Sequence, residues 1–85
     1  MTSDKQLLTI IVNGVPAAIE RNEHAVLLSA IEAALQQTGN VGQPPENWEL
    51  RDANGNLLDV HQKISDFHFP SDVKLFLSLR AGVGG

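Results

Sequence analysis

The dipeptide Asn13-Gly14 constrains the fold of this chain more than any other feature, because it separates two β-rich runs, Leu7–Val12 and Val15–Ile19. Asn-Gly is the strongest two-residue hairpin signal, since a type I′ turn requires φ > 0 at both central positions. The turn predicts three facing pairs on the core face: Val12 with Val15, Ile10 with Ala17, and Leu8 with Ile19. Pro16 has the opposite parity and cannot donate to a ladder, so we expect the second strand at a sheet edge.

A change of hydrophobic period after residue 25 predicts one helix, from about Val26 to Thr38. Its apolar residues recur at three- and four-residue spacing: Leu28, Ile31 and Leu35. Asn22 or His24 can cap the start of the helix, and Gly39 is placed to end it in the left-handed conformation. The helix is therefore expected to be short and to bury one face.

Short β-elements are predicted in the second half of the chain. Pro44-Pro45 excludes regular structure after the helix, because each proline fixes φ and removes a donor. The segments that follow are a strand at Trp48–Arg51 with Leu50 inward, a very short strand at Leu57-Leu58, a single helical turn at Ile64–Phe67, and an alternating strand at Val73–Leu79. Asn54-Gly55 supplies a second turn.

This order of elements predicts an α+β domain of the β-grasp type, with a mixed sheet of four to five strands and one helix packed across it. The first and last strands should lie side by side and parallel at the centre. We expect one domain over residues 1–80, with residues 1–5 mobile and residues 81–85 forming a flexible Gly-Gly tail.

Composition excludes several function classes. The net charge is −4 and the six Lys and Arg residues are scattered, so we expect no nucleic acid partner. No apolar run approaches the ~20 residues of a membrane span, and the N-terminus does not resemble a signal peptide. Cysteine is absent, which fits a cytoplasmic protein and excludes a thiolate site.

Residues in the second half resemble ubiquitin. The matching features are Pro44-Pro45, the Ile64–Phe69 turn, the strand Val73–Arg80, and the terminal Gly84-Gly85. More closely, the whole chain is similar to the small bacterial ubiquitin-like proteins encoded beside E1-like and E2-like enzymes. The stretches that carry this similarity are Ile10–Gly14, Gly42–Asp52 and Leu75–Leu79.

The resemblance implies a protein modifier whose Gly85 carboxylate is adenylated by an E1-like enzyme, carried as a thioester and joined to a target through an amide or an ester. It also implies an E2-like conjugating enzyme and a deconjugating peptidase as partners, with ATP used by the activating enzyme and no cofactor bound here. The chain would be a substrate and not an enzyme. Gly84 and Gly85 would pass through a constricted site, Gly82 would add flexibility, and Val83 would be a spacer or seat in a small pocket. If Gly85 is the encoded end, no protease is needed to expose the carboxylate.

A docking surface is expected on the outer face of the sheet. Leu7 and Ile11 have the outer parity of the hairpin, and Phe76 has the outer parity of the last strand. Arg51 stands where ubiquitin carries an apolar companion on this face, so the patch should be rimmed by charge. Trp48 either covers the core rim or contacts a partner.

Two other functions remain open. A sulfur carrier of the same fold would bear a C-terminal thiocarboxylate, although the double proline and the Ile64–Phe67 turn favour the modifier. A passive β-grasp binding module would make the tail incidental. The three histidines show no metal-ligand spacing, and the Ser65-Asp66 pair near His68 indicates a turn and not a hydrolase site.

Overall fold

The computed structural model describes residues 6–82, so the predicted mobile segment 1–5 and the tail residues 83–85 lie outside the described part. Its elements, in chain order, are β1 (Leu7–Val12), β2 (Val15–Glu20), α1 (Leu27–Gln37), the 3-10 helix η1 (Pro45–Asn47), β3 (Trp48–Arg51), the 3-10 helix η2 (Ile64–Phe67), and β4 (Lys74–Leu79).

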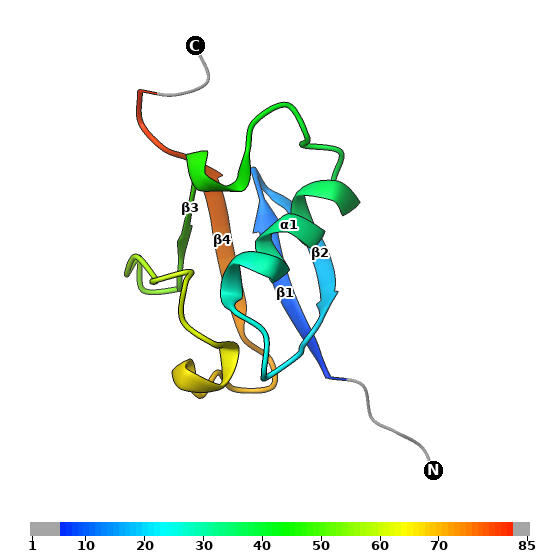
Figure 1. Ribbon diagram of the computed structural model, residues 1–85, viewed down its shortest axis with the longest axis vertical. Coiled ribbons are helices and arrows are strands. Elements are labelled where there is room, and N and C mark those ends of the chain that lie inside the picture. Colours follow the sequence, from blue (N-terminus) through cyan, green and yellow to red (C-terminus); the bar gives the residue numbers. More distant parts are fainter. Residues whose placement is uncertain (1–5, 83–85) are drawn as a thin grey trace.

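The four strands form one mixed sheet in the order β2-β1-β4-β3, and α1 crosses one face of it (Figure 1). Strands β1 and β4 are parallel at the centre, as predicted, and the two neighbouring pairs are antiparallel. This is the β-grasp, or ubiquitin-like, fold. The very short strand expected at residues 57–58 is only an isolated bridge between Leu57 and Arg51.

The hairpin has the register that its turn predicts. Asn13 and Gly14 both have positive φ, at 50° and 87°, as a type I′ turn requires. Val12 faces Val15, and the other two predicted pairs are also in register. One expectation is wrong: Val15 is 53% exposed and not part of the core, because it follows the turn at the end of the edge strand.

The start of α1 differs from the prediction. Neither Asn22 nor His24 caps the helix, because its N-cap is Val26 and makes no side-chain cap bond. Instead, the backbone carbonyls of the 59–62 loop accept the first helical N–H groups: Leu27 N donates to Gln62 O at 2.9 Å, and Leu28 N donates to Val60 O at 2.8 Å. Tertiary contacts therefore replace a local cap.

The end of α1 is as predicted. Gly39 has φ +78°, and its N–H donates to Gln36 O at 3.2 Å. The N–H of Asn40 donates to Leu35 O at 2.8 Å, which completes a Schellman motif. Glycine fits this position because it adopts the left-handed conformation without a Cβ clash.

The core lies between α1 and the inner face of the sheet. Its buried side chains are almost all aliphatic: Leu8, Ile10, Val12, Ala17, Ile19, Leu27, Ala30, Ile31, Ala34, Leu35, Trp48, Leu50, Ile64, Leu75 and Leu77. Leu50 points inward, as predicted. Of the predicted last strand, Val73 precedes the first paired residue and is only half-buried.

A buried cation ties the connection after β2 to the loop before β4. The side chain of Arg21 is only 6% exposed and contacts the Glu23 carboxylate at 2.7 Å. Its other nitrogens donate to the carbonyls of Phe69 and Pro70, at 2.7 and 3.1 Å. Arg21 thereby satisfies two loop carbonyls beside the core. Between residues 6 and 82, no helix has the length and apolar character needed to cross a membrane.

Candidate functional site

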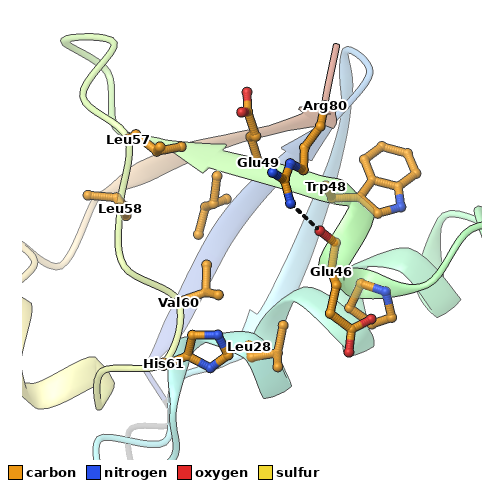
Figure 2. Close-up of a pocket in the computed structure, with 11 residues that line it drawn as sticks. Leu28, Glu46, Trp48, Glu49, Leu57, Leu58, Val60, His61 and Arg80 are labelled. Atoms are coloured by element: carbon orange, nitrogen blue, oxygen red, sulfur yellow. Dashed lines mark hydrogen bonds between the residues drawn. The ribbon is translucent and has the colours of Figure 1, made fainter. Parts of the chain in front are cut away.

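The chain leaves the sheet beside η1. The N–H of Arg80, the first residue after β4, donates to Asn47 O at 2.8 Å. Its guanidinium Nη1 donates to the carbonyl of Glu46 at 3.3 Å, as Figure 2 shows. The backbone bond continues the pairing of β4 with β3 beyond Leu79, and the side-chain bond adds a second contact with η1, so Arg80 is held beside η1 where the tail starts.

Of the predicted tail residues, Gly82 is described and Val83, Gly84 and Gly85 lie outside the described residues. Gly82 has φ +91°, a conformation that other residues rarely adopt, and no heavy atom beyond its two chain neighbours lies within 4 Å of the position that a Cβ would take. A side chain at this position would therefore strain the backbone without meeting a steric block.

The outer face of the sheet carries one row of side chains across all four strands. The register places Pro16 of β2 beside Ile11 of β1, Ile11 beside Phe76 of β4, and Phe76 beside Arg51 of β3. We call Pro16, Ile11, Phe76 and Arg51 the outer row. Phe76 is 41% exposed at its centre. Of the five residues predicted for the docking surface, the structure brings these three together: Ile11, Phe76 and Arg51.

Arg51 is held at the end of the outer row by two contacts. Its Nη2 atom lies 3.1 Å from Glu49 Oε1, and its Nη1 atom donates to the carbonyl of Gly55 at 3.2 Å. The row is thus an apolar strip that ends in a partly neutralised cation. Sequence reasoning missed Pro16 and Glu49, although their outer parity on the strands was a usable signal.

The other two predicted docking residues do not join the outer row. Leu7 is exposed on the same face, but it lies four residues before Ile11, or about 13 Å along the strand. Of the two alternatives for Trp48, the structure supports the core rim: the side chain lies on the inner face and is only 6% exposed. It pairs with Leu79 in a register that turns its side chain toward the core, so it is unsuited to a surface contact.

A cleft of about 260 Å³ lies at the root of the tail, between β3, the 57–61 loop and α1. Figure 2 shows Val60 and His61 on one side of it, with Glu46 and Arg80 opposite. Trp48 also lines the cleft, and its indole Nε1 is buried without a hydrogen-bond partner. The cleft combines apolar walls with a polar rim next to the point where the tail starts.

One carboxylate near the outer row is electrostatically perturbed. The backbone N–H of Asn56 donates to Asp52 at 2.9 Å, and this bond is the main reason that the pKa of Asp52 is lowered from its ordinary value of 3.8. The N–H of Asn54 donates to the same oxygen at 2.9 Å. Asp52 thus holds the Asn54-Gly55 turn, which in turn supplies the carbonyl that binds Arg51.

Residues 6–82 contain no group of three side chains that could hold a metal ion. His68 has a positive φ of 54° at the end of η2, which makes it a turn residue. The described side chains offer an outer surface, a cleft and an exit path for the tail.

Known proteins are similar to this chain in fold or in sequence. The structure is similar to that of Caldiarchaeum subterraneum ubiquitin, with a TM-score of 0.72, 17% identity, and coverage of 95% of this chain and 100% of that chain. The sequence is 47% identical over 78 residues to "Uncharacterized protein y4jI" of Sinorhizobium fredii. That match covers 92% of this chain and 60% of the relative's length. The family model described as "Protein of Unknown function (DUF2604)" matches residues 2–85, and the chain belongs to this family.

Proposed function

We propose that this protein is a ubiquitin-like modifier whose Gly85 carboxylate is adenylated by an E1-like enzyme, carried as a thioester and conjugated to a target. The observation that carries the proposal is the exit of the chain beside η1. Arg80 is held by Asn47 and Glu46, and a glycine in the left-handed conformation, Gly82, follows it. Gly84 and Gly85 follow Gly82 closely in the sequence.

The chemistry assigns this chain the role of substrate and not of catalyst. A carboxylate does not acylate an amine or hydroxyl until a better leaving group replaces its oxygen. ATP supplies that group: the carboxylate attacks the α-phosphorus, pyrophosphate leaves, and an acyl-adenylate forms on the activating enzyme. A cysteine of the E1-like partner would then displace AMP to form a thioester, and a cysteine of the E2-like partner would take over the acyl group by displacing the first cysteine. This chain has no cysteine. Because activation consumes ATP, we place the reaction in the cytoplasm, with a deconjugating peptidase as the reversing partner.

The outer row is the surface that we assign to the activating enzyme. Phe76 lies on β4 four residues before Arg80, or about 13 Å along the extended chain. An enzyme that grips Phe76 can therefore guide the tail from the same strand. An exposed aromatic ring beside an arginine is also the kind of anchor that dominates protein interfaces.

The test is the intact mass of the protein isolated from its native cell, compared with a variant that lacks Gly84-Gly85. The modifier predicts a ladder of heavier adducts that disappears in the deletion variant. Val41→Ala, an exposed change in the loop after α1, is the matched control and should keep the ladder.

The same spectrum distinguishes the alternatives. Replacement of one terminal oxygen by sulfur would identify a sulfur carrier. An unmodified protein in both strains, with no phenotype for the deletion, would refute both roles and leave a binding module.

A further inference from the structure

A single side chain closes the outer edge of β2. Gln37, the last residue of α1, reaches over to Ala18 with its carboxamide. The N–H of Ala18 donates to Gln37 Oε1 at 3.1 Å, and Gln37 Nε2 donates to Ala18 O at 3.2 Å. A carboxamide has the same donor and acceptor as a peptide group. Gln37 therefore occupies the place that the backbone of a further strand would take.

Apart from Pro16, which has no N–H to donate, the edge that Gln37 covers has the geometry for strand addition. Among residues 6–82, β2 is the outermost strand on its side of the sheet. The two-residue turn directs the backbone groups of Val15, Ala17 and Ile19 toward β1, so those of Ala18 point outward. Uncovered edge groups of this kind are a template for pairing with another chain.

We propose that the Gln37 side chain prevents β2 from pairing with β2 of a second copy of this chain. When that side chain is removed, the two β2 strands pair antiparallel about Ala18. The pairing is self-complementary, because the N–H and C=O of one Ala18 match the C=O and N–H of the other across a two-fold axis. In that register Glu20 of each copy faces Pro16 of the other, so the two carboxylates are not opposed.

The surface beside the edge also allows close approach of a second copy. A shallow groove of about 220 Å³ runs between β2 and α1, and its helix side presents Ser29 and Ala33 ahead of Gln37. These side chains are small and uncharged, so two copies of α1 could lie side by side over the extended sheet. The tail starts next to β3, at the opposite edge, and would stay accessible.

The experiment compares Gln37→Ala with Gln36→Ala, its exposed neighbour on the same helix, by sedimentation velocity over a range of concentrations. We expect the wild type and Gln36→Ala to remain monomeric, and Gln37→Ala to dimerise with an association constant at least about tenfold higher. Adding Ala18→Pro to Gln37→Ala removes the central donor and should abolish the dimer. In dilute Gln37→Ala, the Ala18 N–H should exchange with solvent on the order of tenfold faster.

Two results would overturn the proposal: Gln37→Ala that associates no more than Gln36→Ala, or a dimer that persists after Ala18→Pro. Gln37→Met keeps the length and apolar stem of the side chain without the amide. It takes the place of Gln37→Ala if circular dichroism shows that the alanine variant is unfolded.

Discussion

The two faces of the sheet differ most sharply at neighbouring residues of β4. Leu75 and Leu77 point under α1 and are buried, whereas Phe76, between them, lies 41% exposed on the other face. The inner face is filled with aliphatic side chains, and the outer face carries the outer row of Pro16, Ile11, Phe76 and Arg51. One strand thus contributes to stability on one face and presents a recognition surface on the other, so the two properties should be separable by mutation.

The largest effect is expected from Leu75→Ala on the inner face. Leu75 is completely buried on a central strand, so its truncation leaves a cavity and should lower the free energy of unfolding by about 3 kcal/mol. Urea denaturation followed by circular dichroism measures the change. If Leu75→Ala and Phe76→Ala lowered the free energy of unfolding equally, the two faces would not differ in their contribution to stability.

The next effect compares Arg21, in the connection after β2, with Arg51 of the outer row. Arg21→Ala removes the donor to the part-buried carbonyl of Phe69 and one of the two donors to the carbonyl of Pro70, and should cost about 2 kcal/mol. Arg51→Ala removes a partly exposed ion pair with Glu49, and should cost about 0.5 kcal/mol. The same denaturation measurement applies to both. A larger loss for Arg51→Ala would mean that the outer row stabilises the fold.

Phe76→Ala should separate stability from function. We expect the free energy of unfolding to change by less than about 1 kcal/mol, because the ring is exposed. Thioester formation with an E1-like partner should fall at least about tenfold, as for the loss of an interface anchor. Val41→Ala, an exposed change in the loop after α1, is the control. Unchanged thioester formation would exclude Phe76 from the docking surface.

The smallest effect depends on pH and concerns Asp52. Its folded-state pKa is lowered below 3.8, chiefly by the backbone N–H of Asn56, so its contribution to stability is present above that value. The contribution is lost as pH falls through the folded-state pKa. Asp52→Asn should therefore be less stable than the wild type at about pH 7, and the difference in stability should close as the pH falls through the folded-state pKa of Asp52. A gap independent of pH would contradict this assignment.

The properties of neighbouring residues were sufficient to predict much of the fold. Asn13-Gly14 determined the hairpin and its register, because few residues tolerate positive φ. Gly39 determined the end of α1 for the same reason, and the period of two in β4 distinguished Leu75 from Phe76. With the hairpin and one helix placed, the order of elements was enough to predict parallel β1 and β4 at the centre of the sheet.

Contacts between distant residues decided the rest, and the sequence carried little signal for them. The start of α1 is capped by carbonyls more than thirty residues away, so a search for a nearby capping side chain failed. Trp48 is buried because β3 pairs with the end of β4, and alternation within four residues was too short to reveal it.

The sequence alone thus determined the turns, the helix and the alternation of β4, since each depends on neighbouring residues. Tertiary structure decided which side chains meet: Ile11, Phe76 and Arg51 in one row, and Gln37 on the backbone of Ala18. Such contacts depend on strand order and register across the whole sheet, because side chains far apart along the chain become neighbours only when the sheet has formed.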